Sequence, residues 1–349
     1  MKRILVAPLN WGLGHATRCI PIINALLDFK FQVTIASDGL ALDLLRKEFP
    51  NLNYLELPSY NITYPENGNF KSHFLKLAPS ILKAIKSEKK VVQNYVKRHQ
   101  IDGIISDNRY GVRHPNVPSV FITHQLNVMS GATTWLSSKL QQQLISKFDV
   151  CWVPDFKDEP SLSGNLGHSK FDKIPVKYIG PLSRLKKKDL SLKYKLLVLL
   201  SGPEPQRTLL ENSLRNQLRN YTEPMLFVRG VVTSDNQKKI EGNVYFVDYM
   251  ISADLEIAVN QSEIVLARSG YSTIMDLASL EKKAFFIPTP GQFEQEYLAK
   301  RLDELNIAPC CLQTEFNLEK LKAVVDYSGF KTQTSNIDFE DLFRFFERK

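Results

Sequence analysis

Short apolar runs alternate with longer amphipathic stretches through the first half of the chain. Apolar runs separated by helix-like segments, such as 18–29 and 40–47, are typical of a parallel sheet that is covered on both faces. The pattern therefore predicts a Rossmann-like α/β domain. Its predicted strands are 3–9, 32–37, 52–57, 101–106, 119–123 and 150–153.

The same alternation begins again near residue 195, as expected for a chain of 349 residues, which is long for one hydrophobic core. A helix is predicted over 205–221. Gly180-Pro181 and the lysines at 186–188 lie between the two series and indicate an exposed connector. We therefore expect an α/β fold with domains at 1–180 and 193–330, a linker at 181–192, and an amphipathic C-terminal helix within 331–349 that packs back on the body. The strands predicted for the second domain are 195–201, 225–228, 244–247, 264–267 and 284–287.

The composition, 43% hydrophobic and 23% charged, is that of a globular protein. No apolar run approaches the roughly 20 residues that span a bilayer. We interpret residues 1–8 as a buried strand, because their apolar run is too short for a signal peptide and no cleavage site follows it. The four cysteines are spaced neither for zinc nor for a disulfide framework, which is typical of a reducing cytoplasm.

The formal net charge is +8, and much of the positive charge lies in residues 71–98, which contain eight Lys or Arg side chains and one acidic side chain, Glu88. Apolar residues recur among them with helical spacing. Two interpretations remain open at this point: a solvated helix face, or a surface attracted to an anionic membrane, where each Lys or Arg contributes about 1 kcal/mol. Nucleic acid is disfavoured, because aromatic side chains do not alternate with the charges. The expected location is the cytoplasm, with peripheral contact at the inner membrane face under the second interpretation.

The loop after the first predicted strand contains Gly12, Gly14 and His15. Glycines let a ligand approach the backbone, and the helix that follows offers unpaired amides. A histidine at the carboxyl end of a parallel strand lies where such sheets bind ligands. His15 is therefore a candidate catalytic base, the alternative being a helix cap or a bond to a carbonyl.

Asp107 follows another predicted strand, and strand ends of one parallel sheet meet at one edge. A carboxylate bonded to one imidazole nitrogen fixes the tautomer and makes the other nitrogen more basic, as removal of a proton from a hydroxyl requires. The alternative for Asp107 is a turn cap with Asn108. His124 ends a third strand, and we expect it to contact an acceptor molecule.

In the second half, a predicted strand leads into a helix start rich in small polar residues, which suits a diphosphate. Asp276, about one turn further on, can accept hydrogen bonds from ribose hydroxyls. Glu294 and Gln295 open the next helix and can bond hydroxyls of a sugar. The residues at the first helix start are Ser269, Gly270, Ser272 and Thr273.

These motifs resemble the GT-B nucleotide-sugar glycosyltransferases, especially the branch of the lipid-linked peptidoglycan N-acetylglucosaminyltransferase, with its family 28 C-terminal domain. The resemblance lies in Arg268-Ser269-Gly270, Asp276, Glu294-Gln295, the segment 246–250, and the N-terminal Gly12-x-Gly14-His15 loop. It implies two Rossmann-like domains with parallel sheets facing a central cleft, and a UDP-sugar donor that is a substrate rather than a cofactor. It also implies acceptor contacts at Gly12, Gly14, Arg18 and His124, and from the strand-end argument above we expect His15 and Asp107 to be the catalytic residues. The implied donor contacts are Ser201, Gly202, Arg207, Met250, Arg268, Ser269, Gly270, Ser272, Thr273, Asp276, Glu294 and Gln295.

Two features depart from this family. The usual Gly-Gly-Ser loop is replaced by residues 200–207, in which Ser201 and Gly202 keep the small side chains, but Glu204 would repel a diphosphate if it pointed inward. Asp276 is one methylene shorter than the family's glutamate.

The expected activity is transfer of a hexose or N-acetylhexosamine from a UDP-sugar to a glycan or lipid-linked acceptor of the cell envelope, with inversion. No metal is expected, because no Asp-x-Asp pair follows a strand. A UDP-sugar hydrolase with a similar Gly-His-x-x-Arg pattern, a UDP-sugar epimerase, and a non-catalytic sugar-nucleotide or nucleic-acid binding protein remain as alternatives. The basic, apolar segment 59–98 favours a large acceptor over water.

Overall fold

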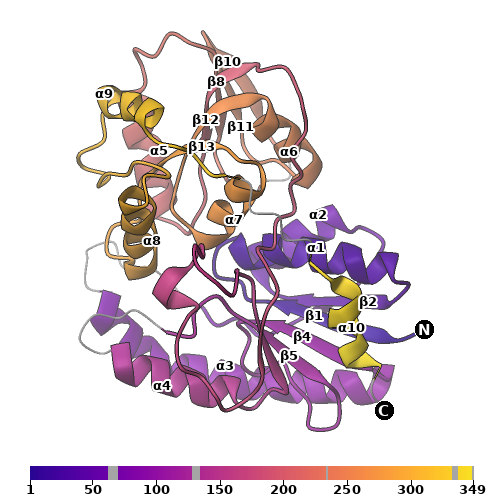
Figure 1. Ribbon diagram of the computed structural model, residues 1–349. Helices are drawn as coiled ribbons and strands as arrows, with labels where there is room; N and C mark the ends of the chain where they lie inside the picture. Colours follow the sequence, from indigo (N-terminus) through magenta and orange to yellow (C-terminus); the bar gives the residue numbers. More distant parts are fainter. Residues whose placement is uncertain (62–69, 128–133, 233–234, 332–336, 348–349) are drawn as a thin grey trace. The chain divides into compact units, whose positions relative to one another are not determined.

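The computed structural model describes residues 1–61, 70–127, 134–232, 235–331 and 337–347, without the side chains of 70–78 and 134–137 (Figure 1). The chain divides into two compact units. Unit 1 contains residues 1–62, 71–182 and 334–349, and unit 2 is built mainly from residues 183–333. Each unit is an α/β domain around its own sheet, and each is described by itself below.

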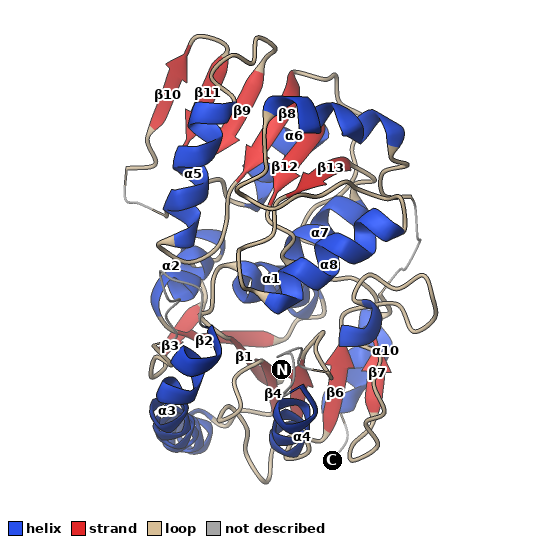
Figure 2. Ribbon diagram, turned by 90° about the vertical axis from the view of Figure 1, so that its left-hand side faces the viewer, coloured by secondary structure: helices blue, strands red, loops and turns tan. Residues whose placement is uncertain are grey.

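Unit 1 contains a seven-stranded sheet of order β3-β2-β1-β4-β5-β6-β7, in which every neighbouring pair is parallel. Helices α1 (Gly14–Asp28) and α2 (Gly39–Glu48) lie on one face, while α3 (Phe70–His99) and α4 (Thr134–Ile145) lie on the other (Figures 1 and 2). The central strands β4 and β5 are buried along their whole length, and β1 from its second residue on, because both faces are covered. The strands are β1 (Arg3–Pro8), β2 (Gln32–Ser37), β3 (Asn53–Glu56), β4 (Gly103–Asp107), β5 (Ser119–Ile122), β6 (Val150–Val153) and β7 (Val176–Tyr178).

The strand order of unit 1 reverses between β1 and β4, which lie side by side although α1, α2 and α3 separate them in the chain. The register places Pro8 opposite Asp107 at the carboxyl ends of the two strands. Such a switch point is where open α/β sheets bind their ligands, because the loops leave it in opposite directions. The loop before α1 starts at this point.

Unit 2 contains a six-stranded sheet of order β10-β11-β9-β8-β12-β13, parallel except for the pair β10 and β11. Helices α5 (Gln206–Gln217) and α6 (Ser252–Asn260) cover opposite faces (Figures 1 and 2). Its switch point lies between β8 and β12. The strands are β8 (Tyr194–Leu199), β9 (Met225–Val228), β10 (Lys238–Glu241), β11 (Val244–Val247), β12 (Ser262–Ala267) and β13 (Lys283–Phe286), and the remaining helices are α7 (Tyr271–Ser279), α8 (Phe293–Glu304) and α9 (Leu318–Leu321).

The C-terminal segment packs on unit 1. Helix α10 (Phe339–Phe343) places the Phe343 ring 5.6 Å from the rings of both Phe29 and Phe31. The 3-10 turn Arg344–Phe346 that follows brings Phe346 edge-on to Trp152, with 6.3 Å between ring centroids. Burial of Trp152, Phe343 and Phe346 fixes this segment against the β1–β2 and β6 region of the unit.

The prediction of two parallel-sheet α/β domains is confirmed, and most predicted strands differ from the observed ones by only one or two residues. Two strands were missed. β7 has three half-buried residues, and β10 is a fully exposed edge strand of sequence Lys-Lys-Ile-Glu, so neither forms an apolar run. Helix α1 begins at Gly14, four residues before the predicted start, and the predicted helix over 205–221 is shorter, Gln206–Gln217.

Candidate active site

His15 and Asp107 meet at the switch point of unit 1. His15 lies in the first turn of α1, and Asp107 is the last residue of β4. The imidazole Nδ1 lies 2.9 Å from Oδ1 of Asp107, although 92 positions separate the residues in the chain. The Asp107 side chain is fully buried and that of His15 is 14% exposed. The carboxylate is therefore shielded from water, while the imidazole retains access to solvent.

Burial and charge act in opposite directions on this pair. Burial lowers the pKa of His15; Asp107 raises it and the Arg18 cation lowers it again, so that the net shift is downward. Burial alone would raise the pKa of Asp107, but the charges and hydrogen bonds of Arg18 and His15 hold it well below its usual range. At neutral pH the pair is therefore an ionised carboxylate beside a neutral imidazole, as a general base requires.

Arg18, predicted as an acceptor contact, lies beneath this pair with only 3% of its surface exposed. Its Nε and Nη2 donate to the two carboxylate oxygens of Asp107. Its Nη1 lies 2.8 Å from Nδ1 of His124, which follows β5 and is also buried. The structure thus brings together four of the predicted residues of unit 1 in one cluster.

The two predicted glycines of the same loop lie at the start of α1. Gly12 has a φ of 70°, in the left-handed region that favours glycine. A Cβ placed on it would have no atom within 4 Å, so its backbone borders open space. Gly14 is the first residue of α1, and its carbonyl accepts a hydrogen bond from the Thr17 hydroxyl at 3.0 Å. The loop is open enough for a ligand to approach.

A second buried charge network supports this loop, and the sequence prediction missed it. Arg109 is fully buried; its guanidinium pairs with Glu88 from α3 and, at 2.6 Å, with Asp38. Asp38 in turn accepts a hydrogen bond from Asn10 at 3.1 Å, and Tyr60 donates to Glu88 at 2.8 Å. The one available signal was the position of Arg109 two residues after Asp107, because a charge so close to a buried strand end needs a partner. The network connects α3 to the loop before α1, the helix that carries His15.

In unit 2, the loops after β8 and β12 both leave the switch point. Helix α7 begins at Tyr271 with Gly270 as its N-cap, and its first turn contains no acid. A Cβ on Gly270 or on Gly202, which follows β8, would meet no atom within 4 Å. Helix N-termini of this kind favour anions, because unpaired amides point outward from them. Ser272 and Thr273 lie half-buried in this first turn, and Ser201 is half-buried beside Gly202.

Ser269 and Arg268 are turned into the protein. The Ser269 hydroxyl donates to the carbonyl of Gln295 at 2.7 Å. The Arg268 guanidinium, 1% exposed, donates to acceptors of the protein itself, and these hydrogen bonds tie the end of β12 to the loops after β8 and β13. Burial lowers the pKa of Arg268 to about 10, so it remains a cation at neutral pH. Its acceptors are the carbonyls of Gln206, Ile287 and Pro288 and the side-chain oxygen of Gln313.

Asp276 lies on α7 and is contacted by the segment that begins unit 2. Its Oδ1 accepts from the Ser183 hydroxyl at 2.8 Å, and its Oδ2 lies 3.8 Å from Nε of Arg184. Burial raises the pKa of Asp276, against the opposing effects of Arg184 and Ser183. A ligand hydroxyl at this carboxylate would therefore have to share it with Ser183 or replace that residue.

Arg207 and Glu204 bond to each other at the start of α5. The Nε of Arg207 donates to Oε1 of Glu204 at 2.7 Å, and its Nη1 donates to Glu211 at the same distance. Partial burial alone would raise the pKa of Glu204, but hydrogen bonds from Thr208 and Arg207 lower it. Glu204 is thus neutralised by a local cation rather than left beside the loop as an isolated charge.

The remaining predicted donor residues lie in the loop after β11 and in the first turn of α8, which follows β13. Gln295 is buried in the first turn of α8, and its Oε1 accepts from the amide of Thr289 at 2.9 Å, which shapes the loop before the helix. Glu294 is half-buried in the same turn, and Met250 is half-buried shortly after β11. The roles of these residues toward a ligand stay predictions.

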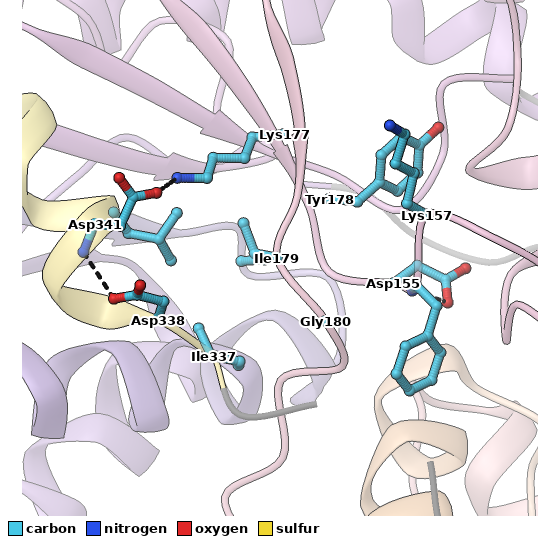
Figure 3. Close-up of a pocket in the computed structure, with 11 residues that line it drawn as sticks. Asp155, Lys157, Lys177, Tyr178, Ile179, Gly180, Ile337, Asp338 and Asp341 are labelled. Atoms are coloured by element: carbon cyan, nitrogen blue, oxygen red, sulfur yellow. Dashed lines mark hydrogen bonds and ion pairs between the residues drawn. The ribbon is translucent and has the colours of Figure 1, made fainter. Parts of the chain in front are cut away.

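A cavity of about 310 Å³ lies at the β6–β7 edge of unit 1, away from its switch point (Figure 3). Lys177 and Asp341 form an ion pair at its wall, and Asp155 lies across from them. Predicted site residues are not among those that line it.

In the part of the chain that the structure describes, no three His, Cys, Asp or Glu side chains are grouped to hold a metal ion. Nor does any helix there have the length and apolar character needed to cross a membrane.

Comparison with known proteins finds a family match for part of unit 2. Residues 206–337 match the glycosyltransferase family 28 C-terminal domain. An uncharacterised glycosyltransferase of Methanosarcina mazei is 24% identical over 328 residues, which cover 86% of this chain and 83% of that protein. The UDP-N-acetylglucosamine–N-acetylmuramyl-(pentapeptide) pyrophosphoryl-undecaprenol N-acetylglucosamine transferase of Haemophilus ducreyi is 22% identical over 261 residues, 71% of this chain and 68% of its own length. The crystal structure of Acinetobacter baumannii MurG is similar with a TM-score of 0.55 and 15% identity, over 93% of this chain and 90% of that one. At this identity the likeness to MurG concerns the fold.

Proposed function

We propose that this chain transfers a hexose or N-acetylhexosamine from a UDP-sugar to an acceptor hydroxyl, with inversion and without a metal. The proposal starts from the GT-B fold and from the match of residues 206–337 to the glycosyltransferase family 28 C-terminal domain. The observation that carries this proposal is the pairing of His15 with the buried Asp107 at the switch point of unit 1. A neutral imidazole held by a carboxylate is the group that such a transfer requires as its base.

In the proposed reaction, Nδ1 of His15 keeps its proton and donates a hydrogen bond to the Asp107 carboxylate, so that Nε2 is the basic nitrogen. Nε2 removes the proton of the acceptor hydroxyl as the oxygen attacks the anomeric carbon. The bond from that carbon to the diphosphate oxygen breaks, and UDP leaves with the electron pair. Direct displacement from the opposite side inverts the anomeric configuration.

The donor side of the proposal rests on the two open loops of unit 2. The first-turn amides of α7, at Ser272 and Thr273, suit the diphosphate, and the negative charge that grows on it is stabilised by the helix N-terminus. Asp276 is proposed to hold the ribose hydroxyls. Arg268 is assigned to shaping these loops, since its guanidinium bonds to backbone carbonyls around them.

A lipid-linked acceptor at an anionic membrane surface is proposed from helix α3. In its described part, Lys83, Lys86 and Lys90 are exposed on one side, and Lys97 and Arg98 are exposed near its end. Glu88, the acid of this segment, is fully buried against Arg109 and does not reduce the positive charge of the outer face. Such a surface is attracted to anionic lipid. The Haemophilus ducreyi relative is named for a pyrophosphoryl-undecaprenol acceptor, in agreement with this proposal.

The test combines donor binding with turnover. Thermal shift should show stabilisation by UDP, about 2.7 kcal/mol at a concentration of 100 times its Kd. His15→Ala should lower turnover at least about a hundredfold and leave UDP binding intact. His99→Ala, an exposed histidine of the same unit, serves as the matched control and should change neither. A flat UDP screen, or full turnover in His15→Ala, would contradict the proposal, and donor consumption at the full rate without acceptor would indicate a hydrolase instead.

A further inference from the structure

Arg18 contacts three titratable side chains at once from the second turn of α1. Its guanidinium meets both oxygens of Asp107, and it lies 2.8 Å from Nδ1 of His124 and 2.8 Å from Nδ1 of His15. Arg18, Asp107 and His124 are all at most 5% exposed. In such a cluster the placement of each proton is decided by the neighbours rather than by water.

The contact with His124 determines where that imidazole carries its proton. A guanidinium has only donors, so the His124 Nδ1 that faces Arg18 must accept. An accepting Nδ1 has no hydrogen, which makes His124 neutral and leaves its proton on Nε2. Nε2 of His124 is then a hydrogen-bond donor and not a base.

At His15 the proton lies on the other ring nitrogen, Nδ1. Its Nδ1 has two neighbours, Oδ1 of Asp107 at 2.9 Å and Nη2 of Arg18 at 2.8 Å. That Nη2 already donates to the same carboxylate oxygen, and the ionised carboxylate is the stronger partner for an imidazole N–H. The proton therefore lies on Nδ1, and Nε2 is the basic nitrogen.

We propose that Arg18 is a positioning residue that holds His15 and His124 in opposite tautomers, one with its proton on Nδ1 and the other with its proton on Nε2. Arg18 does so by fixing the Asp107 carboxylate for His15 and by donating directly to His124. This differs from the expected role of Arg18 as an acceptor contact. The consequence for turnover rests on the proposed function, whereas the tautomers themselves do not.

The charge of Arg18 has a second effect on this cluster. The groups that face His15 or its partner are Asp107 at the end of β4, Arg18 and Cys19 on α1, and His124 after β5. The Arg18 cation lowers the pKa of His15 and also keeps Asp107 ionised. Loss of this cation should raise the pKa of His15, so that the base becomes protonated at a higher pH.

The test reads the tautomers directly in the full-length protein. Long-range proton–nitrogen NMR spectra of protein labelled with ¹⁵N-histidine distinguish Nδ1–H from Nε2–H, and His15→Ala and His124→Ala assign the signals. We expect Nδ1–H at His15 and Nε2–H at His124. In Arg18→Met, which keeps the aliphatic length, the His124 preference should be lost, and kcat/KM at pH 6 relative to pH 8 should fall about threefold more than in the parent.

Arg18→Lys separates geometry from charge. Lysine retains the cation but lacks the planar fork that reaches two partners, so it should keep the parent pH profile and lose the His124 tautomer. Nδ1–H at His124 in the parent protein, or unchanged spectra and pH profile in a folded Arg18→Met, would overturn the inference. If the expected tautomers are found but no transfer occurs, the proposed function fails and this inference stands. If transfer occurs but these tautomers are not found, this inference fails and the proposed function stands.

Discussion

The Ser183 hydroxyl donates a hydrogen bond of 2.8 Å to Oδ1 of Asp276, the carboxylate that we propose for the ribose of the donor. Ribose hydroxyls that bind Asp276 must then share this carboxylate with Ser183 or replace that residue, and we predict that they replace it. Ser183→Ala should therefore bind UDP more tightly, by about two- to tenfold, because a typical hydrogen bond contributes about 0.5–1.5 kcal/mol. Isothermal titration calorimetry with UDP measures this change.

Two controls isolate the ribose contact. Ser279→Ala removes a hydroxyl from the same helix as Asp276 and should leave the Kd for UDP unchanged, since that hydroxyl bonds to the Met275 carbonyl. Pyrophosphate, which has no ribose, should bind Ser183→Ala and the parent protein equally. Weaker UDP binding in Ser183→Ala would show that Ser183 supports the donor site instead of competing with it.

The pH dependence of kcat/KM should follow the ionisation of His15. The pKa of this imidazole is lowered from 6.5, and the base acts in its neutral form. The pH at which the rate falls to half of its plateau should therefore lie below 6.5, because His15 becomes half protonated only below that pH. A midpoint above pH 6.5 would contradict the downward shift.

Asp107→Asn should lose turnover across the whole pH range, because the amide no longer fixes the His15 tautomer.

Removal of the Arg109 side chain should destabilise the protein, although Arg109 is not among the predicted ligand contacts. Arg109→Met leaves the carboxylates of Glu88 and Asp38, which are 0% and 5% exposed, without their shared cation. Breaking a buried pair in this way costs about 3–5 kcal/mol. Urea unfolding followed by circular dichroism should show this loss in the free energy of unfolding. The exposed Arg98→Met provides the comparison and should stay within about 0.5 kcal/mol; a similarly small loss for Arg109→Met would contradict a structural role for the network.

Neutralisation of the outer face of α3 should weaken binding to anionic vesicles. Replacement of Lys83, Lys86 and Lys90 by Gln removes about 1 kcal/mol each, or about a hundredfold in the partition coefficient together. Sedimentation with vesicles that contain anionic lipid, at low salt, measures the change.

The matched control makes the same change of charge elsewhere. Lys238, Lys300 and Lys322 are exposed lysines of unit 2, and their triple replacement by Gln should leave vesicle binding nearly unchanged. Equal losses in the two triple variants would mean that net charge, rather than α3, attracts the protein to the membrane.

The sequence by itself determined the fold class and all strands except β7 and β10, because a strand buried on both faces must be apolar along its length. The end of β4 at Asp107 and the loop at Gly12 were readable for the same reason, since polar residues and glycine interrupt an apolar run there. Strands β7 and β10 were not readable, because half-buried or fully exposed edge strands leave no such run.

Only the tertiary structure decided what the charged side chains contact. Arg18, Arg207 and Arg268 stand in motifs that suggest a ligand, yet their guanidinium groups bond to Asp107, Glu204 and backbone carbonyls within the chain. Strand order placed Asp107 beside His15, and the contact of the segment before β8 with α7 brought Ser183 to Asp276. These pairings depend on long-range packing: the hydrophobic pattern specifies which segments are buried, but the partner of a buried charge is set by whichever loops the sheet order brings together.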